Sequence, residues 1–438
     1  MEIDKTTLHD LSIFTQEEEF SIFHKLDFCA TTGGKEKLMR NCSRSLTSIE
    51  EITGIQETIR LVQQKVPDWP SIISNGTMMV VHKFYESGID QIPTSPTVIS
   101  AYSYKLFHGP DFSLVKYSIG HCFDFLHGMQ LINQLFEGSL MPLPLRKLVT
   151  RAKTILHKEQ FVIISEKKKY DNLTKVEMLR LANFVRYHYK QNMLELMEIY
   201  YQFDAWYSMA VAVSTYDLAF PTIIDHDKST LNAVGLYHLL LPTPVAYDVI
   251  LDPTNNFLFL TGANMAGKST FIKAVGASVY LAHLGMGVPA KEMSLTVFDG
   301  MLSNINVVDN IVKGESYFFN EVQRIKNTII KINDGRKWLI LIDELFKGTN
   351  VQDAMKCSTT VIEGLLKIKN SLFILSTHLY EIANDLKRYP NIAFKYFETR
   401  VDGEELKFNY ELKDGVSNDR LGYLILKREK VIELIEGL

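Results

Sequence analysis

The sequence predicts an α plus α/β protein, with a helical first half and a second half built around a mostly parallel sheet. Neither Gly nor Pro occurs from residue 145 to residue 220, which permits very long helices there. After Pro221, short apolar runs alternate with helical stretches, a pattern typical of parallel strands covered on both faces. We therefore expect a helical domain over residues 1–220 and a sheet-containing domain over residues 221–438.

The composition is that of an ordinary globular protein, with 46% hydrophobic residues and a net charge of −4. The chain is not globally basic, so composition alone gives no nucleic-acid signal, although a local basic face could still bind DNA. Four scattered cysteines lack metal-type spacing and indicate reduced thiols. The start, MEIDKTTLHD, is no signal peptide, and no run reaches the roughly 20 apolar residues of a membrane helix. We expect a cytoplasmic protein without membrane contact.

The second part of the helical half is expected to form two long helices. Apolar residues recur there at helical spacing, at Met193, Met197, Tyr200, Phe203, Tyr207 and Ala210. The polar stretch SEKKKYDN, residues 165–172, is the expected interruption between the two helices. The first 140 residues are mostly helical too, with breaks expected at TTGGKE and PDWPS.

The sheet-containing half begins its expected strands at residues 257, 338 and 371, with the sequences FLFLTG, WLILIDE and SLFILST. Helices are expected from Lys268 and over residues 354–368, between these strands. Because parallel strands end at the same edge of a sheet, the polar residues that follow them are candidates for one site.

A glycine-rich loop follows the first of these strands. Residues 262–269, GANMAGKS, fit the phosphate-binding pattern G-x-x-x-x-G-K-[ST] between a strand and a helix. Its glycines let backbone N–H groups wrap phosphates, and the helix N-terminus adds partial positive charge. The alternative is a glycine turn without function. The expected nucleotide-binding residues are Gly262, Ala263, Asn264, Met265, Ala266, Gly267, Lys268, Ser269 and Thr270.

Three catalytic residues and two metal ligands are expected around this loop. Lys268 would reach the β- and γ-phosphates, and Ser269 and Asp343 would hold Mg²⁺. Glu344 directly follows the strand and would orient or deprotonate the attacking water. His378 ends the next strand and would lie beside the γ-phosphate. The alternatives are solvated acids at a strand end and a structural histidine.

Several motifs, in order along the chain, resemble those of the MutS family of DNA mismatch-repair proteins. TGANMAGKST resembles the family's T-G-P-N-M-G-G-K-S-T, and GESYFFNE resembles G-x-S-T-F-x-x-E. DELFKGTN resembles D-E-I-G-R-G-T-S, and STHLYE resembles A-T-H-Y-F-E. Upstream, MEIDKTTLHDLSIF resembles the opening of the family's helical core domain. The L-S-G-G-type signature of ABC and Rad50-type ATPases is absent from the sequence.

The resemblance implies a helical core or lever domain over residues 1–220 and a P-loop, ABC-type ATPase domain over residues 221–438. It also implies ATP and Mg²⁺ as cofactors and a homodimer with ATP at its interface. Ser316 would reach the γ-phosphate bound by the other subunit, unless it is only a helix N-cap. Departures from the family motifs cluster where two subunits are expected to meet and bear on hydrolysis rate and partner choice. They are Tyr317 for Thr, Phe346 for Gly and Asn350 for Ser.

Candidate DNA contacts lie in the helical half. Residues 145–175 carry nine basic and three acidic residues, including Lys167, Lys168 and Lys169 near the expected interruption. A solvated helix face is the equal alternative. Phe84-Tyr85-Glu86 matches the F-x-E triplet by which MutS inserts a phenylalanine at a mismatch. Because the core begins at Met1, we expect the mismatch-recognition and connector domains to be missing and Phe84 to be an ordinary apolar contact.

Two functions stay open at this point. The first is an ATP-dependent DNA-binding protein of the MutS type. It would hydrolyse ATP at a dimer interface to move helical levers around double-stranded or branched DNA, in mismatch repair or recombination control. The second is a nucleotide-gated scaffold ATPase that acts on protein partners without mismatch recognition. The order of the motifs disfavours a P-loop ATPase of another family.

Overall fold

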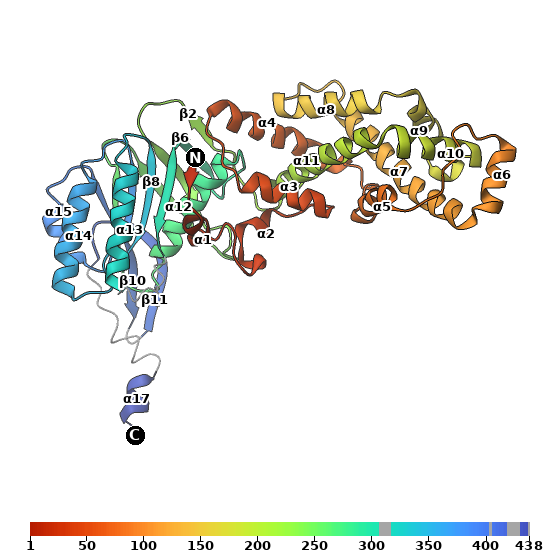
Figure 1. Ribbon diagram of the computed structural model, residues 1–438. Coiled ribbons are helices and arrows are strands. Elements are labelled where there is room, and N and C mark those ends of the chain that lie inside the picture. The colour runs from red at the N-terminus through yellow and green to blue at the C-terminus, as the bar shows by residue number, and fades with distance from the viewer. Residues whose placement is uncertain (306–316, 403–404, 418–429, 437–438) are drawn as a thin grey trace. The chain divides into compact units, whose positions relative to one another are not determined.

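The computed structural model describes residues 1–305, 317–402, 405–417 and 430–436, which form two compact units. The sheet unit consists of Met1–Lys25, Ser45–Thr53 and Thr215–Leu438. The helical unit consists of Leu26–Arg44 and Gly54–Ser214. Figure 1 shows the helices of one unit and the sheets of the other. The predicted combination of helices with a mostly parallel sheet is confirmed.

The division of the chain differs in detail from the one expected at residue 220. The border at Thr215 lies close to it, but residues 1–25 and 45–53 group with the sheet. Strand β1 (Glu2–Ile3) explains part of this, because it pairs in parallel with β7 (Gly300–Asn304). A pairing between segments so far apart leaves no local sequence signal. The assignment of a lever domain and an ATPase domain stays a prediction.

The larger sheet has seven strands in the order β1-β7-β8-β9-β5-β10-β11. Every neighbouring pair is parallel except β10 with β11. The remaining strands are β5 (Phe257–Gly262), β8 (Trp338–Asp343), β9 (Leu372–Ser376), β10 (Ile392–Asp402) and β11 (Glu405–Asp414). β5, β8 and β9 are buried along almost their whole length, which explains their unbroken apolar sequences.

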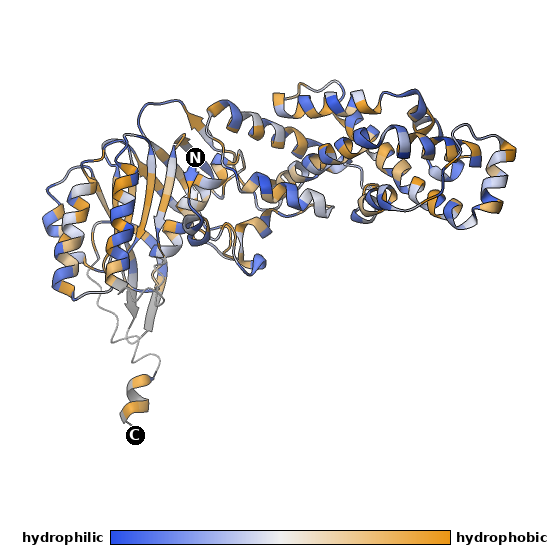
Figure 2. Cartoon of the chain, in the orientation of Figure 1, coloured by the Kyte–Doolittle hydropathy of each residue, from blue (hydrophilic) through white to orange (hydrophobic). Residues whose placement is uncertain are grey.

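Helices cover both faces of this sheet (Figure 1). They are α12 (Lys268–His283), α13 (Tyr317–Ile332), α14 (Val351–Leu365) and α15 (Ala383–Leu386). One core joins Phe259 and Ile340 of the strands to apolar residues of α13 and α14. On the other face Gly276 of α12 lies so close to Leu341 that a Cβ there would be 2.5 Å from its side chain. Figure 2 shows apolar residues concentrated on the strands and a mixture of polar and apolar residues along α13 and α14.

A second sheet of four strands lies in the same unit, in the order β2-β6-β3-β4. Its strands are β2 (Thr222–Ile224), β3 (Leu231–Leu236), β4 (Tyr247–Leu251) and β6 (Glu292–Thr296). β4 alternates buried and exposed residues, as expected for a strand with one covered face. Further short helices of the unit are α1 (Lys5–Asp10), α2 (Ile22–Leu26, at its border) and α17 (Val431–Glu436).

The helical unit packs its helices around one long central helix, α7, which contacts α5, α8 and α10. Its helices are α3 (Thr32–Cys42), α4 (Ile49–Lys65), α5 (Asn75–Glu86), α6 (Val98–Phe107), α7 (Gly109–Leu135), α8 (Leu143–Leu156), α9 (Val162–Lys167), α10 (Lys175–Asn183) and α11 (Lys190–Thr215). Within the described part of the chain, no helix combines the length and the apolar character needed to cross a membrane.

The expectation of two long helices is only half right. The second is present, since the π-helical turn Phe184–His188 joins α10 almost directly to α11. The first ends early, at Leu156, and the chain turns through a 3₁₀ segment that brings Phe161 inward. The Phe161 ring is 1% exposed and lies 5.6 Å from the Phe184 ring and 5.4 Å from the Tyr189 ring, between centroids. Burial of this ring outweighs continuation of the helix.

Candidate functional site

The glycine-rich loop leads from the end of β5 into α12, as the pattern predicts. Three of its residues have positive φ, namely Gly262 (140°), Met265 (66°) and Gly267 (109°). At Gly262 and Gly267 the residue must be glycine, because the backbone has a positive φ and neighbouring atoms leave little room for a side chain. A Cβ on Gly262 would lie 3.1 Å from the Phe397 carbonyl oxygen, and one on Gly267 would lie 3.3 Å from the Tyr410 ring.

Lys268 begins α12 and is almost completely buried, at 5% exposure. Its Nζ donates hydrogen bonds to the backbone oxygens of Gly262 (2.8 Å) and Ala263 (3.0 Å), so the loop curls around its own lysine. Burial lowers the pKa of Lys268 to about 8, although the carboxylates of Glu344 and Asp343 act in the opposite direction. A cation in this position is held ready for an anionic ligand.

The carboxyl ends of β8 and β9 bring three predicted residues together. Asp343 is buried and accepts a hydrogen bond from the Ser376 hydroxyl. Glu344 follows with a positive φ of 66° and donates its N–H to the Ser376 carbonyl oxygen at 3.0 Å. The His378 Nε2 lies 2.6 Å from Glu344 Oε1, and the Lys347 Nζ lies 3.3 Å from Glu344 Oε2.

These contacts determine the protonation state of Glu344. Burial opposes ionisation of its carboxyl, but the hydrogen bond and charge of His378, with Lys347 and Lys268, lower the pKa to about 2. Glu344 is therefore a carboxylate at neutral pH. Sequence reasoning placed His378 beside a phosphate, whereas the structure gives it a direct contact with Glu344.

A cavity of ≈ 500 Å³ opens over the loop. Its lining includes eight residues predicted from the sequence, namely Ala263, Asn264, Met265, Gly267, Lys268, Ser269, Thr270 and Glu344. Four predicted residues, Gly262, Ala266, Asp343 and His378, lie outside the lining. Of these, Gly262 and Asp343 end β5 and β8, and His378 contacts Glu344. The lining thus joins the N-terminus of α12, one buried cation and one carboxylate.

The other wall of the cavity is mostly apolar and aromatic, and sequence reasoning missed it. It consists of Leu241, Pro242, Thr243, Val245, Tyr247 and Tyr410. Tyr410 lies in β11 with a positive φ of 55°, opposite a register shift between Phe397 and Thr399 of β10. Such a bulge redirects a side chain, here toward the cavity. The sequence analysis assigned no role to the segment LPTPVAY, which leads into β4, and nothing in the sequence marked Tyr410.

The predicted metal ligands fit Mg²⁺ by their chemistry. Ser269 offers a hydroxyl oxygen and Asp343 a carboxylate, which are the hard oxygen donors that Mg²⁺ prefers. One carboxylate oxygen of Asp343 is held by Ser376, which orients the group. Two protein ligands suffice where phosphate oxygens and water complete the shell.

Other predicted site residues lie elsewhere. Ser316 falls outside the described residues. Lys167 ends α9 and forms an ion pair with Glu177 at 3.3 Å, so it is already engaged. Lys168 and Lys169 are exposed and line a cleft of ≈ 580 Å³ in the helical unit. Phe84 is fully buried in α5, which confirms its interpretation as an apolar contact.

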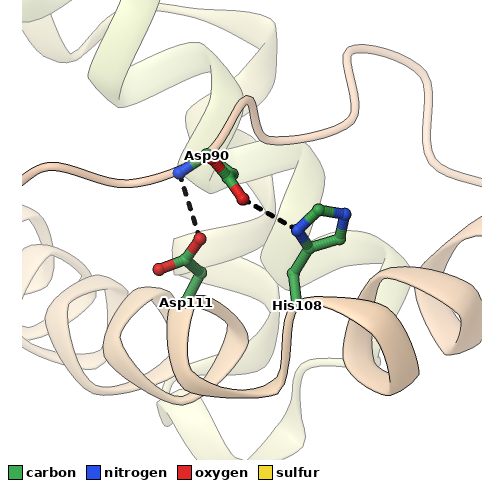
Figure 3. Close-up of side chains that lie close together, drawn as sticks. All are labelled: Asp90, His108 and Asp111. Atoms are coloured by element: carbon green, nitrogen blue, oxygen red, sulfur yellow. Dashed lines mark hydrogen bonds and ion pairs between the residues drawn. The ribbon is translucent and has the colours of Figure 1, made fainter.

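One further cluster of metal-ligand types occurs among the described residues, in the helical unit. Asp90, His108 and Asp111 place one ligand atom each within 4.8 Å of one another (Figure 3). The His108 Nδ1 lies 2.9 Å from Asp90 Oδ2, and Asp111 Oδ2 accepts a hydrogen bond from the Asp90 N–H at 3.1 Å. These bonds tie the loop before α6 to the start of α7, which accounts for the cluster as a structural anchor.

Comparison with known proteins gives consistent matches. Residues 258–434 match MutS domain V. The chain is 27% identical over 291 residues to the DNA mismatch repair protein MutS of Thermotoga maritima, covering 63% of this chain and 36% of that one. The MutS of Carboxydothermus hydrogenoformans is 29% identical over 292 residues, covering 63% and 34%. MutS protein homolog 4 of Homo sapiens is 29% identical over 245 residues, covering 51% and 26%.

The alignments with the bacterial relatives span about a third of those proteins' length. Within the chain, the domain V match begins at Leu258. It contains the glycine-rich loop, Glu344, His378 and Tyr410. The loop and the acids Asp343 and Glu344 fall in the segment that the family model describes, whereas the cavity lining from Leu241 to Tyr247 lies before it. The domain V match and these relatives support membership of the MutS family.

Proposed function

We propose that the cavity over the glycine-rich loop binds Mg²⁺-ATP and hydrolyses it. The observation that carries the proposal is the joint placement of Lys268, Ser269 and Glu344 in the lining of one cavity. Its two walls suit the two ends of a nucleotide. Backbone N–H groups and the start of α12 suit the phosphates, and the wall formed by Val245, Tyr247 and Tyr410 suits the base.

Binding starts with Lys268. Its Nζ would exchange the backbone oxygens of Gly262 and Ala263 for phosphate oxygens, a replacement favoured by the full negative charge of the phosphates. Mg²⁺ would be held by Ser269 and Asp343, and when bound it neutralises charge on the β- and γ-phosphates. The buried position of the lysine strengthens this attraction because little water screens it.

Hydrolysis would depend on Glu344. Its carboxylate is ionised and can accept a hydrogen bond from the attacking water. A pKa of about 2 makes it a weak base, however, as long as His378 and Lys347 hold its two oxygens. A γ-phosphate would compete for the Lys347 ammonium and for the hydrogen bond of His378, and the loss of these contacts would raise the pKa of Glu344. Substrate binding would in this way switch on the base.

At the level of the whole protein, we propose a homodimer that binds double-stranded or branched DNA and moves its helical units when ATP is hydrolysed. The relatives named DNA mismatch repair protein MutS favour this function. Lys168 and Lys169, exposed beside Lys116 in their cleft, are the proposed phosphate contacts. The buried Phe84 favours recognition that does not depend on a mismatch.

The second candidate is a nucleotide-gated scaffold that acts on protein partners. The net charge of −4 favours this candidate over a DNA-binding protein, because an acidic chain repels the DNA phosphates. ATP hydrolysis in the presence of homoduplex, mismatched duplex and four-way junction DNA separates the two candidates. Stimulation by any of these DNAs supports the first, and equal rates with and without DNA support the second. Absence of hydrolysis in every condition would contradict both.

A further inference from the structure

A buried carboxylate on α13 holds the loop that follows Glu344. The Oε1 of Glu321 accepts a hydrogen bond from the N–H of Lys347 at 3.0 Å, and its Oε2 accepts one from the N–H of Gly348 at 3.1 Å. Glu321 is only 5% exposed. A carboxylate is left in such a place only when its charge is well compensated, and here two consecutive backbone donors compensate it.

An aromatic contact also joins the same turn of α13 to the loop after β8. The Phe318 ring lies 5.8 Å from the Phe346 ring, between centroids, and Phe346 is 5% exposed. Phe346 has a positive φ of 60°, and so does Glu344 at 66°. Two residues other than glycine in this conformation, two positions apart, persist only where the surroundings fix the backbone. Glu321 and Phe318 supply that fixation.

The loop after β8, which Glu321 and Phe318 hold, positions the proposed catalytic groups. Glu344 begins it, and Lys347, whose N–H is bound by Glu321, places its own Nζ 3.3 Å from Glu344 Oε2. A shift of the Lys347 backbone would therefore move both the cation and the carboxylate. Asn350, at the end of the segment, accepts a hydrogen bond from the Asp353 N–H and caps α14, which fixes the far end.

We infer that Glu321 is a positioning residue for ATP hydrolysis, which holds the loop after β8 so that Glu344 points at the attacking water. Glu321 can have this role only if the cavity hydrolyses ATP, as proposed above. It lies outside the cavity lining and should leave nucleotide binding almost unchanged. Its effect should therefore fall on the chemical step. In the sequence, α13 begins one residue after Ser316, so displacement of that helix would also reach Glu344.

The test compares Glu321→Gln with wild type in steady-state ATP hydrolysis and in binding of a fluorescent ATP analogue. Gln keeps the size but turns an amide N–H₂ toward one of the two backbone donors. We expect kcat to fall about 10- to 100-fold, as for a small misplacement of a catalytic group, and KM to change less than about twofold. The control Glu363→Gln removes a carboxylate of α14 that pairs with Arg388, and it should change neither constant.

The outcomes separate this role from the proposed function. Wild type that hydrolyses no ATP overturns the function itself, whereas active wild type with an equally active Glu321→Gln variant overturns only the positioning role. Equal losses in kcat and in analogue binding would mean general damage and would also contradict it. Should the Gln variant fail to fold, Glu321→Asp decides, since it keeps the charge with a shorter reach. An intermediate kcat with normal KM is expected, and wild-type kcat would refute the role.

Discussion

Lys268 is a central residue of the proposed nucleotide site, and its buried charge makes it sensitive to pH. Its ammonium group contacts only backbone oxygens of the loop among the hydrogen bonds described. Burial lowers its pKa from 10.5 to about 8. The protonated fraction of Lys268 therefore decreases as the pH rises through 8, and below pH 7 protonation is nearly complete.

The dissociation constant for Mg²⁺-ATP should consequently rise with pH. If only the charged form binds, an apo pKa near 8 gives a weakening of about 30-fold between pH 7 and pH 9.5. An ordinary lysine would give less than about twofold over the same range. Isothermal titration calorimetry at several pH values measures this. Lys268→Arg, which stays charged, is the control, and a wild-type constant that does not vary with pH would contradict the buried cation.

Local sequence predicted one wall of the cavity but not the other. The loop, Lys268 and Glu344 follow strands directly, so a short pattern fixes their positions. Tyr410 reaches the cavity only through a register shift and a positive φ in a strand about 140 residues further on. The contact between His378 and Glu344 likewise depends on side-chain geometry that no spacing encodes.

Among the elements, α5 contains a triplet that resembles a mismatch wedge but has a buried phenylalanine. Phe84 is 0% exposed, and the Arg186 guanidinium lies 5.0 Å from its ring centroid. Phe84→Ala should lower the free energy of unfolding by about 3–5 kcal/mol because it leaves a cavity. Met79→Ala, an exposed position of the same helix, should change it by less than about 0.5 kcal/mol. Urea denaturation followed by circular dichroism measures both, and equal effects would place Phe84 at the surface.

The start of α3 gives a second prediction for an element. A Cβ on Gly34 would lie 2.0 Å from Asp204 Oδ2, the carboxylate that binds the N–H groups of Ala30 and Thr31. Gly34→Ala should therefore destabilise the protein by about 1–3 kcal/mol. Gly76→Ala in α5, where the nearest atom lies at 3.7 Å, should leave stability unchanged or raise it by up to about 1 kcal/mol. Thermal unfolding of both variants is the measurement, and a gain of stability in the first would be incompatible with the packing.

The presence of helices was easier to predict than their lengths. The absence of Gly and Pro from residues 145–220 correctly indicated helices, and Met193 to Ala210 mark the apolar face of α11. The early end of α8 was not predictable, because burial of Phe161 against rings further along the chain decides it. TTGGKE marks the start of α3 rather than a break, because its glycines admit α11.

For the whole molecule, the order of strands and helices in the second half was predictable and the composition of the sheet unit was not. The buried strands β5, β8 and β9 read directly as apolar runs. Residues 1–25 join the sheet unit partly because β1 pairs with β7. The sequence gives no sign of this pairing, because the two strands are about 300 residues apart.

The proposed homodimer can be tested by complementation. Lys268→Ala should lose nucleotide binding, and Ser316→Arg should obstruct a site completed by the second subunit. Each variant alone should be inactive, while a mixture contains heterodimers with one intact composite site and should recover part of the ATPase activity. Size-exclusion chromatography must show that heterodimers form. Heterodimers without recovered activity would mean that each subunit works alone.

The most direct test of the central claim measures ATP bound and phosphate released by Glu344→Gln. Gln has the shape of the carboxylate without its basicity, and it leaves the loop and Lys268 in place. The variant should bind ATP with an affinity close to that of wild type and retain it, while phosphate release slows by about 100-fold or more. Phosphate release at the wild-type rate would contradict the assignment of Glu344 as the base and with it the proposed hydrolysis site.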